Sequence, residues 1–210
     1  VSKLDMYQAN IPSKYGGRIS SVMDLKVKNP YADKLKFNGG IGLLSSRLGI
    51  TTPIIKDKLL FLAGFRGGFT DFLFPIFIDR LKNTKANFYD STIKLLYLFN
   101  DNNQFSYSHF LSNDFYQLDL ISSIENINSS SNQYDFVTSN HTFKWIHRLK
   151  NNTALKTMFI NSKYSPNNFF PEYNSENVIR FKAKVKYISG LTEFTDIRNE
   201  KIDYFLGIQL

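Results

Sequence analysis

The sequence predicts an all-β protein: a fragment of an antiparallel transmembrane β-barrel, an open arc of about 8-9 strands. Three observations support this fold class. Apolar and polar residues alternate along many short segments, polar turns of two lengths separate these segments, and the 210 residues include 20 Phe and 12 Tyr. A period of two is typical of a strand with two unlike faces, because successive side chains of a strand point to opposite sides.

The clearest alternation lies at 179–188. One side carries the apolar residues Ile179, Phe181, Ala183, Val185 and Tyr187, and the other carries the cationic row Arg180, Lys182, Lys184 and Lys186. A helix would distribute these charges around its circumference, so the pattern favours a strand. We expect the cationic row to line a lumen or an extracellular hairpin, where it would attract an anionic solute. A merely solvated face is the alternative.

The remaining strands are expected at 58–66, 92–99, 104–112, 142–147, 153–164 and 202–210. Each combines one apolar side with one more polar side. In the segment 142–147, for example, Phe143 and Trp145 share one side, while Thr142 and Lys144 share the other. If the apolar sides face lipid, we expect Phe61, Leu95, Tyr97 and Phe143 to be accessible, and Lys94 and Lys144 to point to the opposite face.

The connections between these strands fall into a short and a long class. Short polar connections are expected at 55–57, 100–103 and 149–152, and long ones at 68–87, 113–132 and 165–175. Short and long connections alternate, as in outer-membrane barrels, which have tight periplasmic turns and long extracellular loops. A soluble β-sandwich also alternates its faces and mixes its turn lengths, so this fold remains an alternative.

Composition and motifs exclude several functional classes. No apolar run is long enough for a transmembrane helix, and the absence of cysteine excludes a disulfide framework and a thiolate metal site. Of the histidines His109, His141 and His147, the last two are too far apart along the chain for one zinc ion, so no metal is expected. No nucleophile elbow, phosphate loop or acid/base pair is present, which predicts no enzyme, no catalytic residue and no cofactor.

The net charge of +8 permits an anionic partner such as lipopolysaccharide or nucleic acid. The basic residues are spread through the strands and turns and are not gathered into one arm. We therefore expect no nucleic-acid partner.

Residues 11–25 read Ile-Pro-Ser-Lys-Tyr-Gly-Gly-Arg-Ile-Ser-Ser-Val-Met-Asp-Leu. This segment resembles the end of the plug domain in TonB-dependent outer-membrane receptors, especially those of the Bacteroidetes type. Residues 39–48 and 53–58 resemble that family's first barrel hairpin and first periplasmic turn, so the resemblance covers residues 1–74. One departure is Arg66-Gly67-Gly68-Phe69, where the family often has Arg-Arg-Thr-Tyr.

The resemblance implies two regions: the end of a plug domain at 1–30 and the first strands of an incomplete outer-membrane β-barrel at 31–210. It also implies that the plug contacts the barrel through Tyr15, Gly16, Gly17, Arg18, Ser20 and Ser21. Paired glycines permit close backbone approach, and an arginine offers a planar fork for carboxylates. Residues 15–28 are then expected to lie off the barrel wall, and the first wall strand to lie near Phe37.

By this resemblance the chain would be an internal piece of an active transporter in the outer membrane of a Gram-negative cell. Its implied partners are outer-membrane lipid, TonB through a segment missing here, a nutrient of unknown type, and a surface lipoprotein. Two other functions are also compatible with the sequence. One is a soluble β-sandwich that binds carbohydrate, and the other is a passive or structural outer-membrane barrel.

Overall fold

The structure is a computed structural model, and it describes residues 2–12, 15–16, 20–71, 76, 84–118, 132–149, 153–171, 177–199 and 202–209. Within these residues it is almost entirely β. The strands are β1 (Lys3–Gln8), β2 (Ser21–Lys26), β3 (Lys36–Ile41), β4 (Ser45–Ile55), β5 (Leu59–Phe69), β6 (Lys85–Asn100), β7 (Asn103–Leu118), β8 (Asn132–Arg148), β9 (Thr153–Pro171), β10 (Val178–Lys182), β11 (Val185–Asn199) and β12 (Ile202–Gln209). None of the described segments forms a helix with the length and apolar character needed to cross a membrane.

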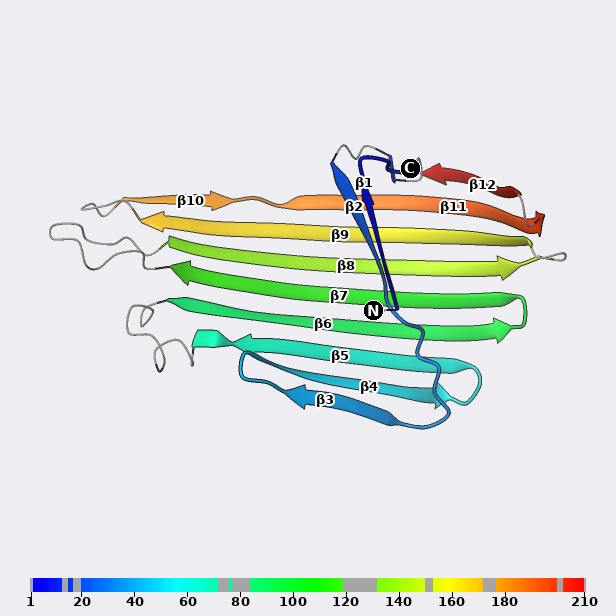
Figure 1. The fold of residues 1–210 in the computed structure, drawn as a ribbon, viewed down its shortest axis with the longest axis horizontal. Coiled ribbons are helices and arrows are strands. Elements are labelled where there is room, and N and C mark those ends of the chain that lie inside the picture. Colours follow the sequence, from blue (N-terminus) through cyan, green and yellow to red (C-terminus); the bar gives the residue numbers. More distant parts are fainter. Residues whose placement is uncertain are drawn as a thin grey trace.

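The strands form one large sheet and one small one. The large sheet has the order β12-β11-β9-β8-β7-β6-β5-β4-β3, and β10 pairs with β9 beyond the end of β11 (Figure 1). Every pairing in it is antiparallel. The terminal strands β3 and β12 do not pair with each other, so the described sheet is open. This confirms the predicted all-β, antiparallel, open fold.

The short turns have a local chemical cause. In the turn between β4 and β5, Asp57 has a φ of 58°, in the left-handed region that Asp tolerates better than most residues. Between β6 and β7, the side-chain Oδ1 of Asn100 accepts hydrogen bonds from the backbone N–H groups of Asn102, at 3.1 Å, and Asn103, at 2.8 Å. A left-handed Asp in one turn and an Asn side-chain cap in the other therefore accompany the tight turns that the sequence predicts.

The strands are longer than the alternation predicts. The predicted loops at 68–87, 113–132 and 165–175 are wrong in part, because β6 begins at Lys85, β7 continues to Leu118 and β9 continues to Pro171. These extensions mix polar residues with adjacent aromatic pairs such as Phe115-Tyr116 and Phe169-Phe170, so they lack the alternation that identifies a half-buried strand. Cross-strand polar pairs continue the ladder there, as when Asn113 Nδ2 donates to Asp135 Oδ1 at 2.7 Å.

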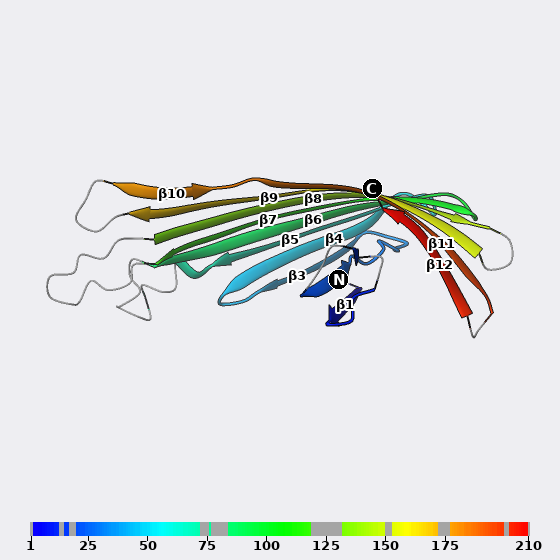
Figure 2. The same ribbon diagram turned by 90° about the horizontal axis from the view of Figure 1, so that it is seen from above.

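The strands β1 and β2 pair only with each other and form a separate antiparallel sheet, here called the N-terminal ribbon. The ribbon crosses one face of the large sheet at a steep angle (Figure 1), and the second view places it on one side of that sheet (Figure 2). Residues 27–35 then lead to β3, which contains Phe37. Residues 21–26 are thus not part of the large sheet, as the sequence predicts.

The register of the large sheet defines two faces, because residues directly opposite each other in an antiparallel pair share a face. Lys94 Nζ donates a hydrogen bond to the backbone oxygen of Val27, at 2.8 Å, so its face is the one that carries the ribbon. This ribbon face includes Leu60, Leu62, Lys94, Leu96, Ser106, Lys144, Lys156 and Glu193. The opposite, aromatic face includes Phe61, Leu95, Tyr97, Phe105, Tyr107, Phe143, Trp145 and Phe159.

The ribbon face buries the leucines Leu60, Leu62 and Leu96 and also charged side chains, while large aromatic residues on the other face are exposed. Lys94 is only 4% exposed on the ribbon face, whereas Tyr97 is 38% exposed and Phe143 is 55% exposed on the aromatic face. Phe61 and Leu95 are half-buried, so of the four residues expected to be accessible two are exposed and two are only partly accessible. Lys94 and Lys144 point to the opposite face, as expected.

Candidate functional site: the two faces of the sheet

The aromatic face carries a continuous apolar band from β4 to β11. Its members include Leu48, Ile50, Leu59, Phe61, Phe65, Ile93, Leu95, Tyr97, Phe105, Tyr107, Phe143, Trp145, Phe159 and Ile188. On β6 apolar side chains recur from Phe99 to Tyr89, interrupted by Ser91. At about 3.3 Å per residue this is about 33 Å of strand, and a strand tilted by about 40° would span about 25 Å, close to the apolar band of a membrane barrel.

Aromatic rings pair across neighbouring strands of this band. Phe105 and Trp145 stack with ring centroids 6.1 Å apart, and Tyr107 and Phe143 approach to 4.7 Å. The indole Nε1 of Trp145 donates to Asn103 Oδ1, at 3.1 Å, close to the short turns. An aromatic ring whose N–H group forms a hydrogen bond at the edge of the apolar band suits a boundary between an apolar and an aqueous phase.

A pair of histidines lies on the same face, and only the register brings them together. His109 is directly opposite His141, with ring centroids 4.4 Å apart, and Tyr107 Oη lies 2.8 Å from His141 Nδ1. Ser139 Oγ is 3.5 Å from His109 Nε2 and 3.4 Å from His141 Nε2. Zinc sites use three or four protein ligands, and the described residues contain no group of three or more potential ligands that could hold a metal.

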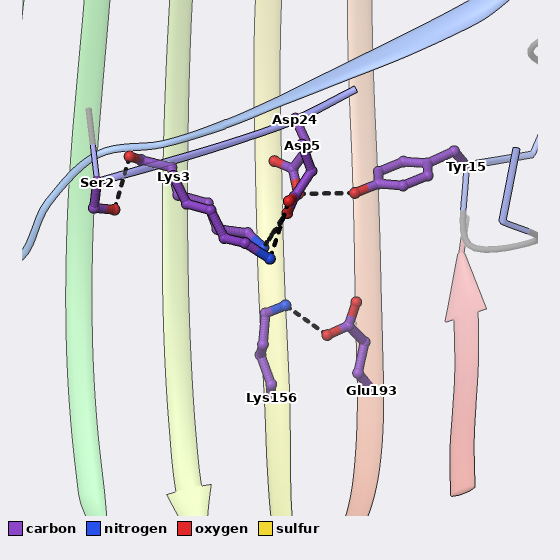
Figure 3. A network of polar contacts seen from close by, with 8 residues as sticks. Ser2, Lys3, Asp5, Tyr15, Asp24, Lys156 and Glu193 are labelled. Atoms are coloured by element: carbon purple, nitrogen blue, oxygen red, sulfur yellow. Dashed lines mark hydrogen bonds and ion pairs between the residues drawn. The ribbon is translucent and has the colours of Figure 1, made fainter. Parts of the chain in front are cut away.

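The ribbon face carries buried charge. Lys156 Nζ donates to Glu193 Oε2 at 2.5 Å, and the Glu193 side chain is only 8% exposed. Figure 3 shows Lys156 and Glu193 extending from β9 and β11 toward the charged side chains of the ribbon. Lys144 lies on β8, between the strands of Lys94 and Lys156. It is repelled by Lys156 and Lys26 and attracted by Glu193. The ribbon therefore meets a polar surface with more cations than carboxylates.

The ribbon has its own network of ion pairs. Asp5 accepts from Lys3 at 3.0 Å and from Lys26 at 3.2 Å, and Tyr15 Oη donates to Asp24 Oδ2 at 2.8 Å (Figure 3). The hydrogen bond from Lys3, with a further contribution from Lys26, lowers the pKa of the Asp5 carboxyl below its ordinary value. Burial, together with the hydrogen bond to Asp24, raises the pKa of the Tyr15 hydroxyl.

The residues expected at a plug-to-barrel contact occupy different environments. Tyr15 belongs to the internal network of the ribbon, and Gly16, Ser20 and Ser21 are exposed. Gly17 and Arg18 lie outside the described residues. The contact from Lys94 to the backbone of Val27 was missed by sequence reasoning, because a lysine on the polar side of a strand gives no sign of its partner.

The cationic row lies on the aromatic face. Arg180 is directly opposite Phe169, Lys182 opposite Asn167, and Lys186 opposite Lys163, all on that face. Lys184 lies in the break between β10 and β11 and is exposed. The apolar row behaves oppositely, since Val185 and Tyr187 are opposite Tyr164 and Ser162 on the ribbon face. The register therefore places the cationic row on the face opposite the ribbon, and its expected location in a lumen or an extracellular hairpin stays a prediction.

Comparison of the chain with protein-family models, with curated proteins and with solved structures gives no significant match.

Proposed function

We propose that this chain is part of a TonB-dependent active transporter of the outer membrane. In this proposal the large sheet is the beginning of the barrel wall, its aromatic face contacts lipid, and the N-terminal ribbon is the end of a plug on the lumen side. The observation that carries the proposal is the uncovered aromatic band opposite a polar face that holds the ribbon.

The energetics favour lipid on the aromatic face. In water, exposed rings such as Phe143 and Phe159 would remain solvated at a cost of about 25 cal/mol per Å² of apolar surface. The reverse orientation would place Lys94 and Lys144 against hydrocarbon, at about 2 to 4 kcal/mol for each lysine near the midplane. A soluble β-sandwich would need a layer over the aromatic face, and the described part of the chain provides none.

Transport requires a plug that is held but can move. The contact from Lys94 to the Val27 backbone is a charge-assisted hydrogen bond, of a class that contributes about 1.5 to 3 kcal/mol. Contacts of this size fit a plug that an energised inner-membrane partner displaces through TonB after a nutrient binds outside. The proposal includes a nutrient of unspecified type and a surface lipoprotein that would deliver it.

The orientation of the sheet is tested with Trp145, the only tryptophan of the sequence. In vesicles of brominated lipid, we expect its fluorescence to be quenched by the bromine atoms. The matched control is W145F/I146W, which moves the tryptophan by one residue to the ribbon face, and this variant should be quenched by iodide in water instead. Equal quenching of both proteins by lipid would contradict the proposed orientation.

Energy coupling is tested separately in the native host. A growth condition is first chosen in which deletion of this gene impairs growth, and TonB is then depleted in the wild-type strain. We expect depletion to reproduce the deletion phenotype. Uptake that depends on the gene but continues without TonB would favour the passive barrel.

A further inference from the structure

Five basic residues lie together at one edge of the apolar band. Arg180, Lys182 and Lys186 share the aromatic face with Lys163. Lys184 lies between Lys182 and Lys186 along the chain. All five are exposed. Lys163 and Lys186 are directly opposite each other, and like charges in this position destabilise a sheet. Such a pair is more favourable when an anion lies against it.

The described residues do not supply this anion. None of the five basic side chains forms an ion pair within the described part of the chain. On the aromatic face of β8, the carboxylate of Asp135 accepts a hydrogen bond from Asn113, at 2.7 Å, and is opposite Asn167. The positive charge is therefore open to a ligand from outside.

The position of the cations relative to the apolar band narrows the choice of ligand. Lys163 follows Phe159 by four residues on β9, and Lys186 precedes Ile188 by two residues on β11. At about 3.3 Å per residue, the charged groups begin about 7 to 13 Å beyond these apolar side chains, toward the end of the sheet away from the short turns. Ile188 is 62% exposed and Phe159 is 49% exposed.

An amphipathic anion fits this arrangement: phosphates at the level of the lysines, and acyl chains against Phe159 and Ile188. Lysine and arginine are the usual ligands for phosphate oxygens, and long basic side chains extend their charged ends along an apolar surface. Arg180 is held over the ring of Phe169, with its Cζ 5.7 Å from the ring centroid, which positions its guanidinium group on the same face.

We propose that Lys163 and Lys186, with Lys182, Lys184 and Arg180 beyond them, bind the phosphates of a phosphorylated lipid of the outer leaflet. The inference rests on the proposed function in one respect, namely that the aromatic face contacts lipid. It assigns the cationic row to a lipid headgroup, and no longer to a solute in a lumen.

The test measures binding of bis-phosphorylated lipid A to the full chain in phosphatidylcholine nanodiscs. The variant is K163Q/K186Q. The matched control is K56Q/K58Q, which removes the same charge from the exposed short turn between β4 and β5. We expect the first variant to bind lipid A about tenfold or more weakly, and the control to differ from wild type by less than about twofold.

Two further ligands identify the chemistry. Lipid A without its phosphates should bind wild type as weakly as lipid A binds the variant, and inorganic phosphate should not compete at equal concentration. Equal binding by the dephosphorylated lipid, effective competition by inorganic phosphate, or equal affinities of both variants would each overturn the inference.

Trp145 quenching, measured in the same preparations with brominated lipid, separates the two proposals. If Trp145 is quenched and the affinities are equal, only the lipid site fails; if it is not quenched, the proposed function fails as well.

Discussion

The two faces of the large sheet differ in what they bury and what they expose. The ribbon face buries the charged residues Lys94 and Glu193 beside leucines such as Leu96, whereas on the aromatic face Phe143 and Phe159 are exposed. A water-soluble sheet would gain free energy by exchanging these environments, since apolar burial is its main driving force. The proposed function accounts for this difference with an apolar medium outside the aromatic face and with the N-terminal ribbon against the other face.

The largest expected effect comes from placing a charge on the aromatic face. We expect Phe143→Lys to lower the free energy of unfolding in lipid vesicles by about 2 to 4 kcal/mol, because it puts an ammonium group near the middle of the apolar band. Urea titrations of the vesicle-inserted protein would measure this change. The control Ser162→Lys adds the same charge to the ribbon face and should cost less than about 1 kcal/mol. Equal losses for both variants would show that the two faces meet the same medium.

The second prediction tests how tightly the ribbon face is packed. A Cβ added to Gly68 would lie 2.3 Å from Cε1 of Phe88, whereas a Cβ added to Gly64 would meet no atom within 4 Å. We therefore expect Gly68→Ala to destabilise the sheet by about 1 to 3 kcal/mol and Gly64→Ala to have little effect. Denaturant midpoints in one detergent would compare the pair. If both variants matched wild type, the Phe88 ring would not be held over Gly68.

The third prediction concerns the attachment of the ribbon. Lys94→Met removes the donor to the Val27 oxygen, so the segment 27–35 should open more often. We expect trypsin to cleave after Lys28 or Lys34 about tenfold faster in this variant, because cleavage follows the population of the open form. The exposed Lys58→Met serves as the control. Unchanged cleavage would assign the attachment of the ribbon to other contacts.

The smallest effect is the acid sensitivity of the ribbon. Lys3 and Lys26 lower the folded pKa of Asp5 below the unfolded value of 3.8. The contribution of Asp5 to the stability of the ribbon is therefore present above pH 3.8 and is lost as the pH falls through the folded pKa. We expect protection of the β1 and β2 amides from hydrogen exchange to decrease at low pH. The ratio of wild-type to Asp5→Asn exchange rates cancels the intrinsic pH dependence. A constant ratio between pH 5 and 2 would show that these ion pairs do not stabilise the ribbon.

Local patterns predicted much of the fold. The alternation at 92–99 and 142–147 correctly separates Tyr97 and Phe143 from Lys94 and Lys144, because the side-chain period of a strand is a local property. The short turns could be predicted for the same reason, since Asp57 tolerates a positive φ and Asn100 accepts from backbone N–H groups two and three residues later. The extensions of β7 and β9 could not be predicted, because they lack a period of two and their strand conformation depends on pairing with β8.

The candidate site depended far more on tertiary structure. The charge-assisted contact of Lys94 with Val27 joins residues 67 positions apart, and the pairing of His109 with His141 joins two strands. Neither has a local signal in the sequence.

By itself, the sequence determined that Val185 and Tyr187 lie on one side of their strand and Lys186 on the other, although the expected strand at 179–188 is divided into β10 and β11 by a break at 183–184. Only the tertiary structure decided which side shares a face with the aromatic band and which with the ribbon. Val185 pairs with Tyr164, and a shift of one residue would have turned every side chain of β11 to the other face. The cations lie beside the aromatic band for this reason, since the face of a strand is a property of its register with a neighbour and not of its own residues.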